Sequence, residues 1–211
     1  MTCHSPCAWR LPAALLLLSL VPVAAGVMRL VGLTGSAAPT VDSARFVAMP
    51  FPVVLHIVGA TLFCLLGALQ FNSALRSRAP VLHRDAGRVA GTGGMLAALS
   101  GVWMALLYPI PEALQGDLLC AVRVLVGMSM ALALGLALGA VLRRRIAQHR
   151  AWMVRAYALG QGAGTQVLIL LPVTWIAGEP TGLLRDVLMT SAWGLNLLIA
   201  ERIVRRRPPS T

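Results

Sequence analysis

Two short groups of histidine and arginine stand at the starts of apolar stretches in this sequence. They are His83-Arg84 with Gly87-Arg88, and His149-Arg150 with Trp152-Met153 and Arg155. Imidazoles from neighbouring helices can ligate one haem iron axially, while arginines bind the propionates. The pattern therefore predicts a b-type haem site with His83 and His149 as iron ligands. The candidate propionate partners are Arg84, Arg88, Arg150 and Arg155.

Two other interpretations of these groups stay open. In one, the site binds a quinone or an anionic headgroup, with histidine carrying a proton and arginine binding the anion. In the other, the residues only anchor helix ends at the membrane interface by contacting lipid phosphates. The sequence alone does not separate the three.

A second candidate site lies at the opposite ends of the apolar stretches. His56 and Arg123 each stand about one to two turns inside such a stretch, and Arg185-Asp186 stands at a similar depth. Charged groups inside a membrane span usually face other helices and mark a site. We therefore expect His56 and Arg123 to face one cavity, with outward-pointing Arg123 and backbone-bonded His56 as the alternative. Deeper polar residues either join helices or line a path: Gln161, Thr165, Gln166 and Asn196.

The amino-acid composition indicates that these residues are carried by membrane-spanning helices. Of the 211 residues, 58% are hydrophobic and only 12% are charged. Because soluble domains carry roughly 25% charged residues, this composition excludes an ordinary soluble domain and a disordered chain. The sequence predicts an all-α, polytopic membrane bundle of about six transmembrane helices. The predicted spans are 11–33, 52–71, 87–108, 118–142, 152–176 and 183–204.

These spans divide the chain into four predicted regions. They are a tail with the first span (1–33), an extracytoplasmic loop (34–51), a five-helix membrane domain (52–204) and a basic cytoplasmic tail (205–211). Val23-Ala24-Ala25 resembles a signal-peptidase site, so cleavage of the first apolar segment is the alternative to a retained helix.

The charge distribution predicts the orientation. All 18 basic residues are arginine, the net charge is +11, and the arginines cluster in alternate connections. Cytoplasmic loops of membrane proteins are enriched in arginine and lysine, so both termini are expected in the cytoplasm. We expect a multi-pass protein of the bacterial inner membrane whose partner is the lipid bilayer and not nucleic acid. Protein partners are not indicated.

Two patterns suggest how the helices pack. The repeated His-Arg groups suggest a tandem pair of helical hairpins of one orientation. Glycines four residues apart, which let helices approach closely, occur at Gly87/Gly91, Gly135/Gly139 and Gly160/Gly164.

Motifs of hydrolases and nucleotide-binding proteins are absent from the sequence. A haem- or quinone-linked redox protein, a small-molecule transporter or binder, and a ligand-free structural or regulatory subunit all remain. Whether the protein is an enzyme stays open.

The chain resembles the bacterial membrane-protein family called domain of unknown function 2306. The resemblance covers roughly 45–172 and is carried by Leu55-His56-Ile57, by 67–71, by His83-Arg84 with Gly87-Arg88, and above all by 149–159. It implies the membrane architecture and places His56, His83 and His149 in the family pattern, but it implies no activity. Many members carry an arginine soon after the threonine of the fifth span, where this chain has Thr165-Gln166. If that arginine serves a ligand, the resemblance implies a lost or altered function here.

Overall fold

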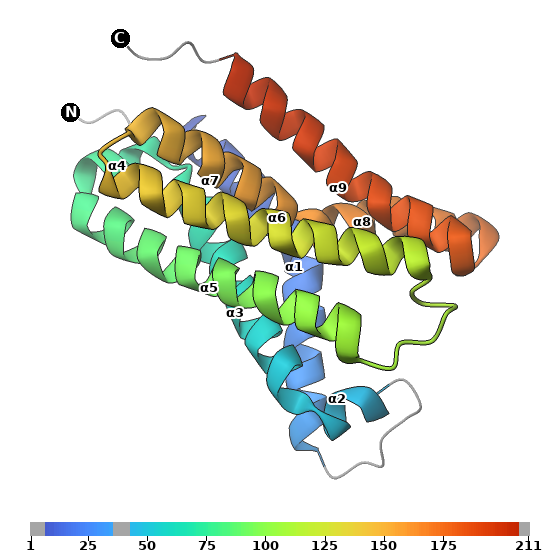
Figure 1. Ribbon diagram of the computed structural model, residues 1–211. Coiled ribbons are helices and arrows are strands. Elements are labelled where there is room, and N and C mark those ends of the chain that lie inside the picture. Colours follow the sequence, from blue (N-terminus) through green and yellow to red (C-terminus); the bar gives the residue numbers. More distant parts are fainter. Residues whose placement is uncertain (1–6, 36–42, 207–211) are drawn as a thin grey trace.

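The computed structural model describes residues 7–35 and 43–206, and this part of the chain is helical throughout apart from its connections (Figure 1). The helices are α1 (Cys7–Thr34), α2 (Ala44–Ala48), α3 (Pro50–Gln70), α4 (Ser73–Arg78), α5 (Pro80–Leu107), α6 (Asp117–Leu142), α7 (Ile146–Gly160), α8 (Gly162–Ala177) and α9 (Gly182–Arg205). Parts of the predicted loop and tails, residues 1–6, 36–42 and 207–211, lie outside the described residues.

Six helical segments are long and apolar enough to cross a membrane, as the sequence predicts. They are Trp9–Thr34, Pro50–Gln70, Pro80–Leu107, Asp117–Leu142, Ile146–Ala177 and Gly182–Arg205. At a rise of about 1.5 Å per residue, each reaches across a hydrocarbon core of about 30 Å. The all-α membrane-bundle prediction is therefore confirmed.

Local sequence signals explain several helix ends. Pro50 and Pro80 occupy first helical positions, where a missing N–H costs nothing. Asn72 caps α4, and its Oδ1 accepts from the backbone N of Ala74 at 2.9 Å. The tight α6–α7 turn places Arg144 at a positive φ of 58°.

The helix boundaries differ from the prediction in four places. Helix α5 begins at Pro80 rather than Gly87, and α7 begins at Ile146 rather than Trp152, because polar and arginine-rich turns also continue a helix at an interface. The fifth span is interrupted at Gln161, which separates α7 from α8. A short helix, α2, lies within the predicted 34–51 loop.

The most extensive helix–helix contact in the described chain joins α3 to α5. A Cβ placed on Gly59 would lie 2.5 Å from the carbonyl oxygen of Gly93, so the two backbones touch. Phe63 and Tyr157 are buried in the main cluster, with ring centroids 5.5 Å apart. By contrast, a Cβ on Gly135 or Gly139 meets nothing within 4 Å, so this predicted pair joins no described helices.

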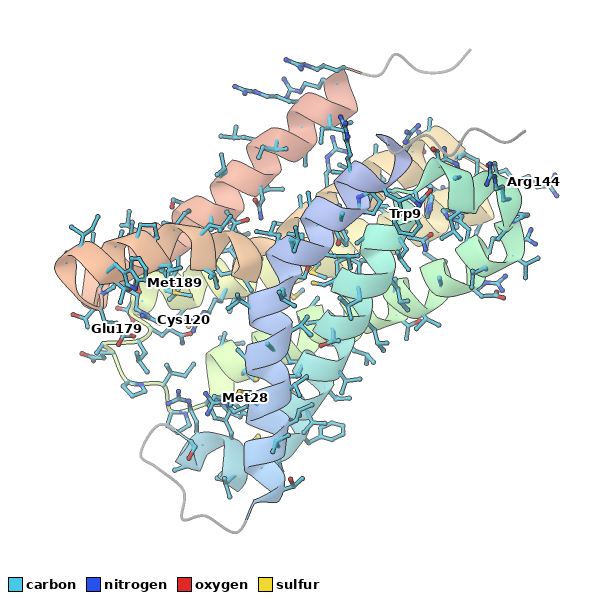
Figure 2. All side chains as sticks on the ribbon, turned by 180° about the vertical axis from the view of Figure 1, so that it is seen from behind. Trp9, Met28, Cys120, Arg144, Glu179 and Met189 are labelled. Carbon is cyan, nitrogen blue, oxygen red and sulfur yellow. The ribbon has the colours of Figure 1, made fainter. Side chains whose placement is uncertain are left out.

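The helices diverge toward one end of the bundle. We call the end that carries α2 the α2 end, and the end that carries α4 and the Arg144 turn the α4 end. Figures 1 and 2 both show α1 and α3 running toward α2, while the α8–α9 turn extends away from them. The divergence leaves room for side chains of several helices to surround a pocket.

Candidate functional site

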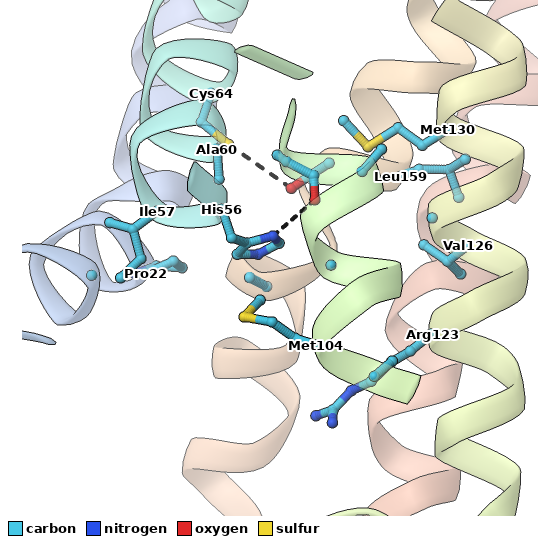
Figure 3. Close-up of a pocket in the computed structure, with 18 of the residues that line it drawn as sticks. Pro22, His56, Ile57, Ala60, Cys64, Met104, Arg123, Val126, Met130 and Leu159 are labelled. Atoms are coloured by element: carbon cyan, nitrogen blue, oxygen red, sulfur yellow. Dashed lines mark hydrogen bonds between the residues drawn. The ribbon is translucent and has the colours of Figure 1, made fainter. Parts of the chain in front are cut away.

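A pocket of about 480 Å³ occupies the space between the diverging helices (Figure 3). Helices α1, α2, α3, α5, α6, α7, α8 and α9 all contribute to its wall. Its volume falls in the range of sites for drug-sized ligands. Most lining side chains are apolar, but the described lining residues include the cations Arg45, Arg123 and Arg185 and no aspartate or glutamate.

Arg123 extends from α6 into this pocket, as Figure 3 shows. Its Nη1 donates to the side-chain oxygen of Gln115, which is neutral. No described carboxylate forms a salt bridge with it. A guanidinium within a membrane span is costly unless an anion or several acceptors surround it. Arg123 is therefore the group in the wall that most requires a negative partner.

Arg185 adds a second cation from α9. Its only described ion pair is to Glu179 at 3.4 Å, and that glutamate side chain is 69% exposed. Its Nε is buried without a hydrogen-bond partner. An exposed, long ion pair of this kind gives little stabilisation. The guanidinium thus keeps donor capacity for another acceptor.

The neighbouring Asp186 does not neutralise the two arginines through a salt bridge. It is 2% exposed, and its oxygens accept from the backbone N of Gly116 at 3.3 Å and of Leu119 at 3.1 Å. The carboxylate therefore satisfies the first turn of α6, where the helix dipole favours negative charge. This contact fixes α9 against α6 and so positions Arg123 and Arg185.

His56 faces the same pocket from α3. Its Nδ1 lies 2.8 Å from the carbonyl oxygen of Ala97 on α5, so Nδ1 carries the proton and donates. Nε2 is then left for a ligand or for solvent. The structure brings His56 and Arg123 together in one cavity, and it also contains the backbone hydrogen bond that the alternative predicted for His56.

Aromatic and cationic side chains gather at the α2 end of the pocket. The guanidinium carbons of Arg29 and Arg45 lie 4.5 and 4.8 Å from the ring centre of Phe46. Phe46 and Tyr108 form a T-shaped ring pair, and the Tyr108 hydroxyl donates to the carbonyl oxygen of Met49 at 2.6 Å. Burial raises the pKa of Tyr108 above its ordinary value of 10.0, so this donor is protonated at neutral pH.

Neutral polar groups form the opposite, inner end of the pocket. Gln161 Nε2 donates to Ser19 Oγ at 3.0 Å and to Tyr157 Oη at 2.7 Å. Tyr157 in turn donates to the carbonyl oxygen of Cys64 at 2.8 Å. The break in the fifth span is therefore tied to α1 and α3 by hydrogen bonds.

The two histidines of the predicted haem site lie at the α4 end. His83 lies in the first turn of α5 and His149 in the first turn of α7. Their backbone N–H groups donate to the carbonyl oxygens of Ala79 and Arg145, respectively. His149 Nδ1 lies 2.9 Å from the carbonyl oxygen of Ala137, while His83 Nδ1 is buried without a partner. Their helical positions are thus equivalent, as the tandem-hairpin hypothesis expects.

The four arginines predicted for propionates are not gathered around these histidines by any described contact. Arg155 is held by Glu201, and Arg88 pairs with exposed Asp85 at 3.0 Å. Arg84 and Arg150 are exposed. Neither the main pocket nor a smaller groove of about 180 Å³ beside α6 and α7 is lined by His83 or His149. The four arginines therefore do not form a propionate clamp in this structure, and their contacts give haem binding no support.

Comparison with known families adds one finding. Residues 53–204 match the profile of the family described as "Predicted membrane protein (DUF2306)". The chain belongs to the DUF2306 family. The match confirms the resemblance and extends it through α9, so Arg123, Arg185 and Gln161 all lie within the DUF2306 segment, whereas Arg45 precedes it. No curated protein and no solved structure gave a significant match.

Sequence reasoning did not identify several residues of the DUF2306 pocket. Arg45 stands in the predicted loop, and Ser19 and Trp193 stand in apolar spans where nothing distinguishes them. The only sequence signal for Ser19 is a hydroxyl among leucines, which is common in membrane helices. Only the packing of the helices places Arg45, Ser19 and Trp193 in the wall of the pocket.

Proposed function

We propose that this DUF2306 protein binds a small organic anion in the main pocket. The observation that carries the proposal is Arg123, which faces a 480 Å³ cavity without a carboxylate among the described lining residues. A carboxylate or phosphate of a ligand would accept charge-assisted hydrogen bonds from its guanidinium. Arg185 supplies unpaired donor capacity at the same end of the cavity.

Binding or transport is better supported than covalent catalysis. Two nucleophiles of the described wall are engaged elsewhere, because Cys64 Sγ contacts the carbonyl of Gly160 and Ser19 Oγ bonds to Leu15 and Gln161. Nucleophilic catalysis requires an adjacent base or a strongly activated group. The pocket therefore acts by holding its ligand.

The arginine distribution supports a location and an orientation. We infer that the α4 end, with Arg76, Arg78, Arg143, Arg144 and Arg145, faces the cytoplasm of a bacterial inner membrane. Both termini then lie in the cytoplasm. The main pocket opens toward the extracytoplasmic side and takes its ligand from there.

A b-type haem or quinone at His83 and His149 is the second candidate. The buried, unpartnered Nδ1 of His83 favours it, because a buried polar atom without a partner is costly. A reduced-minus-oxidised visible spectrum of the detergent-purified protein tests it. Haem binding requires an absorbance band that His149→Ala abolishes while the protein still inserts into membranes.

The anion-binding proposal is tested with charged thiol reagents at Cys64, which lines the pocket. Cys3, Cys7 and Cys120 are replaced by serine, and the variant is reconstituted into liposomes. Its labelling rates with the anionic sulfonatoethyl and the cationic trimethylammonioethyl methanethiosulfonates are each divided by the rate with free cysteine. We expect the anionic reagent to be favoured by about tenfold or more, since a cationic cleft concentrates anions.

Two variants complete this experiment. Arg123→Gln is expected to reduce the preference severalfold, whereas Arg88→Gln, at an exposed pair near the α4 end, leaves it unchanged. If Cys64 reacts with neither reagent, Met104→Cys supplies a second reporter thiol, because Met104 also lines the pocket. Equal rates or a preference for the cation would overturn the proposal, as would failure of both reporters to react.

A further inference from the structure

The lining of the main pocket extends along several helices. On α3 its lining runs from His56 to Cys64, eight residues or about 12 Å along the axis. On α6 it runs from Arg123 to Met130, about 10 Å. The cavity therefore extends from the α2 end toward the middle of the bundle.

The two ends of this cavity differ in chemistry. The arginines lie at the α2 end, while the inner end has the neutral Gln161 and Ser19, whose hydrogen bonds are made within the protein. Between the ends the wall is apolar on four helices, and Figure 3 shows these side chains around the cavity. They include Ile57, Ala60, Met104, Val126, Met130 and Leu159.

Close backbone contacts restrict the inner end. A Cβ on Gly164 would collide with the carbonyl of Leu18, so α8 and α1 touch there. A Cβ on Gly160 would lie 2.6 Å from the ring of Phe63, so the fifth span also meets α3. The helices diverge only beyond these contacts, toward the α2 end (Figures 1 and 2). A ligand therefore reaches the cavity from the α2 end.

We infer that the ligand is an amphiphilic anion with an acidic head and a linear apolar chain. The head lies between Arg123 and Arg185, and the chain follows the apolar wall toward Gln161. This inference rests on the proposed anion binding and specifies its ligand class. A small hydrophilic anion would leave about 10 Å of apolar wall uncovered, whereas a chain of matching length buries it.

The experiment measures protection of Cys64 from the neutral reagent N-ethylmaleimide, in the same single-cysteine protein in liposomes. The probes are acetate, hexanoate and decanoate, with sodium sulfate as a hydrophilic anion and decanol as a neutral chain. We expect the half-protecting carboxylate concentration to fall by up to about fourfold per methylene, as expected for burying one CH₂. Decanol and sulfate are expected to protect poorly.

Two substitutions separate the head from the chain. Arg123→Gln should weaken decanoate protection about tenfold or more, because the head loses a charge-assisted hydrogen bond. Ala60→Leu, which fills the middle of the wall, should remove the advantage of decanoate over hexanoate. Unchanged thermal unfolding midpoints would show that both variants remain folded.

The possible outcomes distinguish the amphiphilic-ligand inference from the anion-binding proposal on which it rests. Equal protection by sulfate, acetate and decanoate would overturn the amphiphile and leave anion binding standing. Equal protection by decanol and decanoate would overturn it too, since the head would contribute nothing. If no carboxylate protects although the anionic labelling preference persists, the ligand class is wrong and the anion site remains.

Discussion

Arg155 on α7 and Glu201 on α9 form a two-point ion pair, with Nε to Oε1 at 2.5 Å and Nη2 to Oε2 at 3.1 Å. The sequence suggested Arg155 as a propionate partner, but this contact commits its guanidinium to α9. Bidentate arginine–carboxylate pairs combine charge with directional hydrogen bonding. The pair therefore links the fifth and sixth spans.

Removing both partners of this ion pair should destabilise the bundle less than the sum of the two single removals. Arg155→Gln or Glu201→Gln is expected to lower the free energy of unfolding by about 1–3 kcal/mol, because a partly buried charge loses its partner. The double variant should lose less than the sum of the two. Unfolding in mixed detergent and sodium dodecyl sulfate measures these differences. The exposed pair Arg88–Asp85 is the control, with an expected coupling near zero; strict additivity at Arg155 and Glu201 would contradict the argument.

The glycines of α3 and α6 should respond oppositely to alanine. Gly59→Ala places a Cβ 2.5 Å from the carbonyl of Gly93, so α3 and α5 must separate, at a cost of about 1–3 kcal/mol or more. Gly135→Ala and Gly139→Ala meet nothing within 4 Å and are expected to be neutral or to stabilise by up to about 1 kcal/mol. The same unfolding assay compares them. A loss at Gly135 or Gly139 comparable to that at Gly59 would show that another helix covers this face of α6.

Tyr108 should make the free energy of unfolding fall at alkaline pH. Burial raises its folded-state pKa above the unfolded value of about 10, so between these two values the folded state holds more protons. Its contribution is fully present below about pH 10 and is lost as pH rises through the folded pKa. Tyr108→Phe should lose about 1 kcal/mol at neutral pH with the hydrogen bond to Met49, and it should lack this alkaline fall. The comparison is the unfolding free energy of both proteins from about pH 8 upward; parallel curves would exclude Tyr108 as the titrating group.

The inferred orientation predicts the activity of fused reporters. A reporter active only outside the cytoplasm should be active after Glu112, in the connection between α5 and α6. The same reporter should be silent after Arg145, in the arginine-rich α6–α7 turn. Activity at both positions would contradict the six-span topology, and the reverse pattern would place the main pocket on the cytoplasmic side.

The apolar runs by themselves determined the number of spans and most of their limits. A run such as Leu118 to Leu142 can satisfy its backbone in lipid only as a helix, whatever surrounds it. The predicted helix starts were wrong where polar residues continue a helix, as at Pro80 and Ile146. Periodicity and hydropathy carry little signal at a membrane interface. The depth of His56 and Arg123 in the membrane could also be predicted, because the apolar runs define the spans and position along a span gives depth.

Only the tertiary structure decided which of these residues meet. Depth does not specify the direction of a side chain around a helix, so Arg45, Ser19 and Trp193 could not be assigned to the pocket beforehand. Likewise, spacing four residues apart did not separate Gly164, whose added Cβ would collide with Leu18, from Gly135, whose added Cβ would meet nothing within 4 Å among the described residues. The sequence determined that polar groups lie within the membrane at given depths, because apolar length and local charge are local properties. Helix rotation, crossing and divergence result from packing between distant segments, and these created the cavity that Arg123 faces.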